Sequence, residues 1–327
     1  MRVLHVIPEL GPGGAEHQLR LLLPRLPVDS AVVTLGGGSL VDPIRATGVP
    51  VTDLGGGRLG PLPALVRLVR RGRYDLVHTH RTSAALYGRA AARAAGGRAV
   101  VATEHALGRT HVDGRPVTAG LRRAYRLSAR LGSATIAVSE PVADRLADWH
   151  VDRVVVIPAG LDPAELAFDP ALRAGTRAAL GLWPSERVIG AVGRLDRGSR
   201  FDVLLRAVAG LDATLLLVGD GPLRAELEAL AGGLGLADRI RFLGPLADLC
   251  PVLCAVDVLA APSAEEGFGL TVLAGLACGL PAVHAGCPAL EALPPGAAPG
   301  TVRGAVDEHD LRAELAAVLD TAGGSRA

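Results

Sequence analysis

Short apolar runs alternate with amphipathic segments along the whole chain, and this alternation constrains the fold more than any other feature. The runs RVLHVI (2–7), AVVTL (31–35) and DLVHTH (75–80) predict strands, whereas the Leu/Val spacing of residues 62–73 predicts a helix. Strands separated by helices pair in parallel, with helices on both faces of the sheet. The strands are almost continuously apolar, as expected for a sheet that is covered on both sides.

The pattern then begins again in the second half of the chain. Strands are expected at 186–195, 213–222, 240–244 and 256–263, with helices between them. A length of 327 residues fits two domains at roughly 100–200 residues each. Pro, Ala and Asp accumulate between residues 160 and 186, so we place the domains at 1–165 and 166–327. In two doubly wound α/β domains, ligands are expected in a cleft at the carboxyl ends of the strands.

The composition excludes several classes of protein. The 34 basic residues, all of them arginine, nearly balance 33 acidic residues, which argues against a nucleic-acid partner. No secretory signal and no apolar run of about 18 residues is visible, so we expect a cytoplasmic protein with reduced thiols. Cys250 and Cys254 have a spacing that could suit a metal, but their apolar surroundings favour buried helix cysteines.

Two glycine-rich loops could receive an anion. GPGGAE (11–16) follows the first strand, and EEGFGL (265–270) precedes a helix and a Gly-Leu-Pro turn into the next strand. Glycines allow close approach to the backbone, and a helix start offers free amides to phosphate. A plain turn at 11–16 and a helix cap by Glu266 remain the alternatives. The first loop lacks the GxGxxG pattern, which argues against a nicotinamide cofactor.

Charged side chains end several of the strands. Arg194 follows the strand in GRLDRGSRFD (193–202), where a guanidinium suits a diphosphate, although a plain surface arginine remains open. His78 and His80 alternate along one strand and so face the same side, and His105 ends the next strand. Such histidines could polarise a hydroxyl or steady a phosphate. Their spacing also resembles a metal site, but no carboxylate or cysteine is placed to complete one, so no metal is expected.

Taken in order, the motifs resemble a known family. GGAE, TEH, AVSE, VIPAG, GRL…RFD, LLLVGDGPL, RFLG and PSAEEGFGLTVLAGLACGLPAV are similar to those of the retaining family 4 glycosyltransferases (glycosyl transferases group 1) with the GT-B fold. The resemblance covers nearly the whole chain. It implies two Rossmann-like domains facing across a cleft, with a nucleoside-diphosphate sugar on the C-terminal domain, an acceptor on the N-terminal domain, and closure of the two. It also implies metal-independent transfer, with UDP or GDP as the expected nucleotide.

The resemblance also implies roles for particular residues. His105 and Glu266 would act at the transferred sugar. The donor's phosphates and ribose would contact the following residues: Gly13, Gly14, Arg194, Arg200, Phe268, Gly269, Leu270 and Thr271. Charge on the leaving nucleotide would be neutralised by Arg194 and the helix start. No nucleophilic carboxylate is evident, so we expect front-side attack by the acceptor hydroxyl.

Three departures from the family pattern keep a second function open. The second glutamate of the family's E-x7-E pair falls on Ala274, an expected lysine falls on Ser199 beside Arg200, and an expected final helix back to the N-terminal domain does not follow residue 327. The alternative is a catalytically silent homologue that binds or stabilises a partner transferase.

The acceptor could be a small molecule, a glycan or a lipid-linked sugar. Arg122, Arg126 and Arg130 form a basic stripe within 121–130 that could meet an anionic membrane, so peripheral contact with the inner face of the membrane is one interpretation. A solvated helix face is the other. The base, the donor sugar and the oligomeric state stay open.

Overall fold

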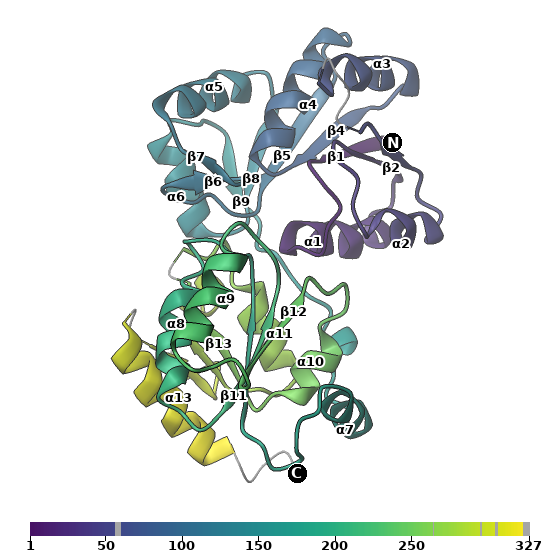
Figure 1. Ribbon diagram of the computed structural model, residues 1–327. Helices are drawn as coiled ribbons and strands as arrows, with labels where there is room; N and C mark the ends of the chain where they lie inside the picture. Colours follow the sequence, from purple (N-terminus) through teal and green to yellow (C-terminus); the bar gives the residue numbers. More distant parts are fainter. Residues whose placement is uncertain (56–59, 264, 295, 305–306, 323–327) are drawn as a thin grey trace. The chain divides into compact units, whose positions relative to one another are not determined.

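The computed structural model describes residues 1–55, 60–263, 265–294, 296–304 and 307–322 of the chain. The chain divides into two compact units, Met1–Gly160 and Leu161–Ala327 (Figure 1). The domain boundary expected between residues 165 and 166 falls inside the short helix η2 (Pro163–Leu166), and Leu166 packs in the core of the second unit. Each unit is an α/β layer structure of the expected class.

Seven parallel strands of the described chain form the sheet of the first unit. Its order is β3-β2-β1-β4-β5-β8-β9. The strands are β1 (Arg2–Ile7), β2 (Asp29–Thr34), β3 (Val51–Asp53), β4 (Leu76–His80), β5 (Ala99–Glu104), β8 (Ala134–Ala137) and β9 (Val154–Val156), and a separate hairpin joins β6 (His111–Val112) to β7 (Arg115–Pro116). The helices are α1 (Gly14–Leu22), η1 (Leu23–Arg25), α2 (Val41–Ala46), α3 (Leu62–Gly72), α4 (Thr82–Ala94), α5 (Ala119–Ala129) and α6 (Glu140–Asp148).

Helices cover both faces of this sheet (Figure 1). On one face α3 and α4 bury Leu65, Val69 and Ala91 against the strands. On the other face α1 and α2 bury Leu19 and Ile44. The strand order reverses between β1 and β4, and open α/β sheets bind ligands at the carboxyl ends of the strands beside such a reversal.

The second unit repeats the plan with six parallel strands among the described residues. Its order is β12-β11-β10-β13-β14-β15. The strands are β10 (Val188–Val192), β11 (Thr214–Val218), β12 (Ile240–Gly244), β13 (Val258–Ala261), β14 (Ala282–His284) and β15 (Thr301–Arg303). The helices, in addition to η2, are α7 (Pro170–Ala179), α8 (Phe201–Ala209), α9 (Arg224–Gly233), α10 (Cys250–Ala255), α11 (Leu270–Ala277), α12 (Pro288–Glu291) and α13 (Glu308–Ala322).

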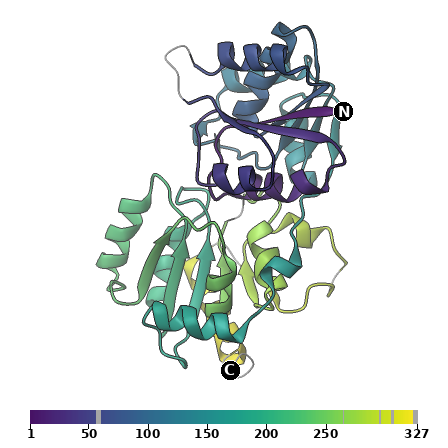
Figure 2. The same cartoon turned by 90° about the vertical axis from the view of Figure 1, so that its right-hand side faces the viewer.

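Here too the sheet lies between two helical layers, as Figure 2 shows from the side. Helices α8, α9 and α13 pack on one face and share a core that includes Leu204, Leu227 and Leu315. Helices α10 and α11 cover the other face through Leu253 and Val272. The strand order reverses between β10 and β13. Ligands of open α/β sheets bind at the carboxyl ends of the strands beside such a reversal, so a ligand is expected at the loops after β10 and β13.

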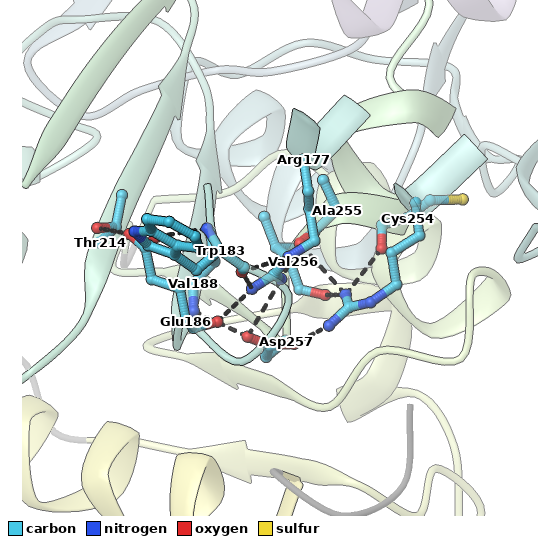
Figure 3. Close-up of polar contacts among 10 residues, drawn as sticks. Arg177, Trp183, Glu186, Val188, Thr214, Cys254, Ala255, Val256 and Asp257 are labelled. Atoms are coloured by element: carbon cyan, nitrogen blue, oxygen red, sulfur yellow. Dashed lines mark hydrogen bonds and ion pairs between the residues drawn. The ribbon is translucent and has the colours of Figure 1, made fainter. Parts of the chain in front are cut away.

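A buried arginine cluster fixes α7 to the second unit. Arg173 pairs with Asp257 (Nη2 to Oδ1, 2.6 Å), and Arg177 lies 3.7 Å from the other carboxylate oxygen (Figure 3). That oxygen also accepts the backbone N–H of Val188 at 2.8 Å. The Arg177 guanidinium further donates to the carbonyls of Ala255 (2.7 Å) and Trp183 (2.9 Å). The cluster therefore provides hydrogen-bond partners for backbone groups next to β10 and β13, such as the N–H of Val188 and the carbonyl of Ala255.

Candidate active site

The loop before α11 has the geometry that its sequence predicts. Gly269 is the residue before the helix and has a φ of 98°, a left-handed conformation that favours glycine. A Cβ at this position would also overlap Sγ of Cys287. Leu270 and Thr271 open the helix, where backbone N–H groups have no acceptor within the helix. The position is therefore suited to hold an anion against the start of α11.

Glu266 lies beside this helix start and is partly buried. Burial raises the pKa of its carboxyl, a hydrogen bond with Ser263 opposes the shift, and the negative charge of Asp196 adds to it. Asp196 belongs to the loop after β10, and the loop with Glu266 follows β13, the neighbour of β10 in the sheet. Phe268 is partly buried, and its carbonyl accepts the N–H of Ala289 at 2.9 Å, which fixes the loop on its far side.

The loop after β10 is held by its own polar groups. Asp196 Oδ1 accepts the backbone N–H of Gly198 at 3.0 Å and of Ser199 at 3.2 Å, and Ser199 Oγ donates to the carbonyl of Arg194 at 2.5 Å. Ser199, at the position of the expected lysine, therefore shapes the loop. Arg194 is exposed, and its Nε lies 3.7 Å from Oδ2 of Asp196. Arg200 precedes α8 and has a φ of 54°. Both guanidinium groups are on the loop that the sequence assigned to phosphate.

In the first unit, the glycine loop leads directly into α1. Gly13 precedes the helix and Gly14 is its first residue, and both are exposed. Glu16, two residues further, is 3% exposed, and a Cβ on Gly13 would overlap its carboxylate. A side chain at Gly13 would therefore have to displace the carboxylate of Glu16.

Arg81 is a residue that the sequence did not single out. It follows β4 with a φ of 74° and pairs with three carboxylates: Glu9 at 3.2 Å, Glu16 at 3.1 Å and Asp113 at 2.8 Å. These acidic residues come from the loop after β1, from α1 and from the β6–β7 hairpin. Arg81 thus ties together the segments that surround the glycine loop.

A cluster of four histidines lies at the strand reversal of the first unit. The rings of His78 and His80 have centroids 4.3 Å apart, so the prediction that both face the same side of β4 is confirmed. His105 Nε2 lies 3.2 Å from His80 Nδ1. The fourth member, His5, was missed, although it pairs in register with His78 on the neighbouring strand β1. Its Nδ1 lies 3.2 Å from His80 Nε2.

Burial keeps these imidazoles neutral. It lowers the pKa of His5 and of His105 to about 3 and that of His78 to about 4, and it holds the pKa of His80 well below its ordinary value. Three of them, His5, His78 and His80, have ring nitrogens within 4.8 Å of one another, a spacing that could also hold a metal ion. A transition metal would accept such neutral nitrogens.

The other positions singled out in the sequence have ordinary surroundings. Ala274 is 7% exposed and packs in the core below α11, and Cys254 and Cys278 are buried, whereas Cys250 is partly exposed. Residues 121–129 are helical within α5, as expected. Arg122 on this helix and Arg130 directly after it are exposed, whereas Arg126 between them is partly buried. In the described part of the chain, no helix is long and apolar enough to cross a membrane.

The expected site residues thus fall into two groups, one in each unit. Loops after β10 and β13 carry Arg194, Arg200, Glu266 and the 268–271 segment. The loop after β1 carries the two glycines, and His105 follows β5.

Two paired α/β units of this kind, each with its candidate residues at strand ends, define the GT-B class of glycosyltransferase. Residues 12–165 match the model described as Glycosyltransferase Family 4, and residues 186–321 match the model described as Glycosyl transferases group 1. The chain therefore belongs to the family 4 (group 1) glycosyltransferases, as the sequence motifs indicated.

Curated relatives share part of this chain. D-inositol 3-phosphate glycosyltransferase of Mycobacterium sp. (strain KMS) is 39% identical over 184 residues, which are 53% of this chain and 41% of the relative. The corresponding protein of Mycolicibacterium smegmatis is 35% identical over the same length, with the same two shares. The alignments thus span less than half the length of these curated relatives.

Solved structures extend the similarity to nearly the whole chain. The Anabaena protein Alr3699/HepE in complex with UDP and glucose is 25% identical with a TM-score of 0.85, covering 99% of this chain and 91% of that one. Sucrose-phosphate synthase from Thermosynechococcus elongatus is 21% identical with a TM-score of 0.81, covering 100% and 92%. At that identity the second similarity supports the fold alone.

Proposed function

We propose that the protein transfers a hexosyl group, with retention and without a metal, from a nucleoside-diphosphate sugar to an acceptor hydroxyl. The observation that carries the proposal is the left-handed Gly269 at the start of α11, with Glu266 beside it and the Arg194 loop adjacent. This arrangement suits a diphosphate at the helix start and a sugar next to the carboxylate. A relative with 25% identity was solved with UDP and glucose, which supports UDP as the first nucleotide to test, with GDP second.

In this mechanism, binding and charge stabilisation are the work of the second unit. Arg194, Arg200 and the first amides of α11 would neutralise the charge that develops on the leaving diphosphate, where fixed donors are most effective. The 268–271 segment would line phosphates and ribose, and Glu266 would accept hydrogen bonds from hydroxyls of the transferred sugar. The acceptor hydroxyl would attack from the face that the diphosphate leaves, which gives retention.

The first unit would hold the acceptor and complete the sugar site. Gly13 and Gly14 would lie against the donor phosphates when the two units close, and His105 would contact the reacting sugar. The acceptor would be a small molecule, a glycan or a lipid-linked sugar. For the curated relatives, the name gives D-inositol 3-phosphate as the acceptor, which makes a phosphorylated polyol a reasonable first acceptor to test.

Calorimetric titration with UDP, GDP, ADP and TDP in the presence of EDTA tests the donor site. We expect micromolar binding of one nucleotide, weakened at least tenfold by Arg194→Ala, because that change removes a cation beside the diphosphate. Glu266→Ala should instead weaken binding of the matching nucleotide sugar, whose sugar hydroxyls lose their acceptor. Arg187→Gln is the matched control, since the guanidinium of Arg187 forms an exposed pair with Asp320. Turnover is then tested by measuring release of the nucleoside diphosphate from its nucleotide sugar in the presence of an acceptor.

A second function is favoured by Ala274 and Ser199, which stand where the family has a donor-site glutamate and lysine. In that case the protein would be a silent homologue that stabilises a partner transferase. It predicts that none of the four nucleotides binds, while a partner transferase gains activity when the two are mixed. Nucleotide binding that is lost in the Arg194 variant contradicts it.

We also propose that α5 contacts anionic lipid. Arg122 and Arg130 are exposed on or next to this helix, and so are Leu127 and Leu131, each 45% exposed. Exposed apolar and basic side chains on one helix suit a lipid headgroup region. Sedimentation with phosphatidylglycerol vesicles should exceed that with phosphatidylcholine vesicles and fall in Arg122→Ser/Arg130→Ser. Equal sedimentation with both vesicles would show that α5 is only a solvated face.

A further inference from the structure

The four histidines at the strand reversal of the first unit form a directed chain of contacts. His80 uses both of its ring nitrogens: Nε2 lies 3.2 Å from His5 Nδ1, and Nδ1 lies 3.2 Å from His105 Nε2. A neutral imidazole has one N–H and one lone pair, so it can donate at one contact only and must accept at the other. Because His80 is 2% exposed, water has little access to replace either contact. The two contacts therefore have to point the same way.

The remaining nitrogen of His5 decides the direction. His5 is fully buried, and its Nε2 has no hydrogen-bond partner among the described residues. If the chain ran from His105 to His5, this nitrogen would carry a buried N–H without an acceptor. Buried N–H groups without partners are rarer in proteins than acceptors left unsatisfied. The favoured direction is thus from His5 Nδ1–H to His80 Nε2, and from His80 Nδ1–H to His105 Nε2.

This direction fixes what His105 can offer to a ligand. With its Nε2 occupied as an acceptor, the single hydrogen of the neutral ring is on Nδ1. His105 is partly exposed, and no described residue lies within hydrogen-bond distance of that Nδ1. The Nδ1–H group of His105 is therefore a hydrogen-bond donor without an acceptor among the described residues.

We propose that His5 and His80 are positioning residues that hold His105 in the Nδ1–H form, so that it donates a hydrogen bond to a hydroxyl oxygen of the bound sugar. The inference rests on the proposed sugar-transferase function for its ligand, but the tautomers are a property of the free protein. In this role His105 is a hydrogen-bond donor and does not remove a proton from the acceptor. Its low pKa agrees with a ring that stays neutral throughout.

His78 offers a matched control on the same strand. Its Nε2 contacts Thr103 Oγ1 at 2.8 Å, outside the His5–His80–His105 series. A His78→Gln variant keeps a polar group near Thr103. It should leave the tautomers of the other three rings unchanged.

The tautomers can be measured directly. Protein labelled with ¹⁵N-histidine gives long-range ¹H–¹⁵N correlations that distinguish protonated from bare ring nitrogens, and His105→Gln assigns the His105 signals. We expect hydrogen on Nδ1 of His5, His80 and His105, although an isolated histidine side chain favours the Nε2–H form. We also expect a ¹⁵N–¹⁵N coupling across the His80–His105 bond. A proton on His105 Nε2 would overturn the proposal.

Two further results would also overturn it. The first is stoichiometric zinc in the purified protein that shifts the nitrogens of His5, His78 and His80, because those atoms lie close enough to share a metal. The second comes from comparing His80→Leu with His80→Asn at equal melting temperature. The amide of Asn can replace the Nδ1–H donor, so kcat/KM for the donor should fall roughly tenfold in the Leu variant and largely recover in the Asn variant. Equal loss in both would mean that His80 only fills space.

Failure of the sugar-transferase function has a different signature. If no nucleotide binds and no sugar is transferred, while the spectrum shows three Nδ1–H rings, the histidine series stands and its ligand is of another kind. If transfer occurs and His105 carries hydrogen on Nε2, the function stands and the positioning role is wrong.

Discussion

At the scale of single residues, Gly269 carries the strictest local requirement in the candidate donor site. Its φ of 98° disfavours any side chain, and a methyl group would overlap Sγ of Cys287. Gly269→Ala should lower the free energy of unfolding of the second unit by about 2–4 kcal/mol, from backbone strain together with overpacking. Urea unfolding measures this loss, and nucleotide affinity should fall with it.

Gly232→Ala is the control for this prediction. Gly232 lies within α9, and a Cβ there would have nothing within 4 Å. That variant should be unchanged or more stable by about 0.5–1 kcal/mol, because alanine loses less entropy in a helix. If both variants behaved alike, the left-handed conformation at Gly269 would not be a requirement of the fold.

Residues recognised from sequence were those with local signals. Gly269 and Glu266 were predicted because a glycine pair directly before an apolar helix specifies the turn by itself. His5 was missed because its meaning depends on its register with His78, a pairing between strands distant in sequence. Arg81 was missed for a similar reason, since its three carboxylates come from separate loops.

At the scale of elements, α7 depends on polar contacts more than on apolar area. The helix is N-capped by Asp169, whose Oδ1 accepts the N–H of Ala171 at 2.8 Å. Arg177→Met should lower the free energy of unfolding of the second unit by about 1–3 kcal/mol, because it removes a buried guanidinium that donates to the carbonyls of Ala255 and Trp183 and lies beside Asp257. Denaturant unfolding provides the measurement.

The exposed pair of Arg187 and Asp320 gives the comparison. Its side chains are 49% and 66% exposed, so Arg187→Gln should change stability by less than about 1 kcal/mol. If Arg177→Met lowered the free energy of unfolding as little as Arg187→Gln does, the cluster would not anchor α7. Sequence could not separate these arginines, since all the basic residues of the chain are of this type.

The longer elements followed from hydrophobic periodicity alone. Strand β1 and helix α3 begin where the pattern places them. The short strands β3 and β15 and the β6–β7 hairpin were not predicted, because two or three residues carry no periodic signal. Strands β3 and β15 pair at the edges of the two larger sheets, whereas β6 and β7 pair with each other.

At the scale of the whole chain, the buried histidines predict that acid destabilises the first unit selectively. Below pH 6.5 the unfolded chain binds protons that the folded unit excludes, because burial lowers the pKa of His5 and His105 to about 3 and of His78 to about 4. As the pH falls from 6.5 towards these lowered pKa values, each histidine reduces the free energy of unfolding by about 1.4 kcal/mol per pH unit. Stability is therefore present near pH 7 and falls towards pH 5.

Two carboxyls of the first unit, those of Glu16 and Glu104, work in the opposite direction, because burial raises the pKa of each. Burial raises the pKa of Glu104 to about 7, so between pH 4.5 and 7 the folded unit holds one proton that the unfolded chain releases. The proton on Glu104 offsets the effect of one histidine on the free energy of unfolding. Because several histidines act together, the first unit still loses stability in acid. Glu104→Gln should therefore make the acid loss steeper, whereas His78→Gln should make it shallower.

Tryptophan fluorescence can follow the first unit alone. Trp149 is buried against Tyr125 in that unit, whereas Trp183 in the second unit is 76% exposed. A Trp183→Phe background leaves Trp149 as the only tryptophan of the two in the chain. Urea midpoints should fall from pH 7 to pH 5. Midpoints independent of pH would contradict the burial of neutral histidines.

The anchoring of α7 has a consequence for synthesis on the ribosome. Asp257, the acidic partner of Arg173, lies 84 residues after it in the chain. At roughly 5–20 residues per second, that partner is added about 4–17 seconds after the arginine. During this interval the nascent helix has neither its counter-ion nor its buried surface. The anchoring of α7 can therefore form only after β10, β11 and β12, half of the described strands of the second unit, have been made.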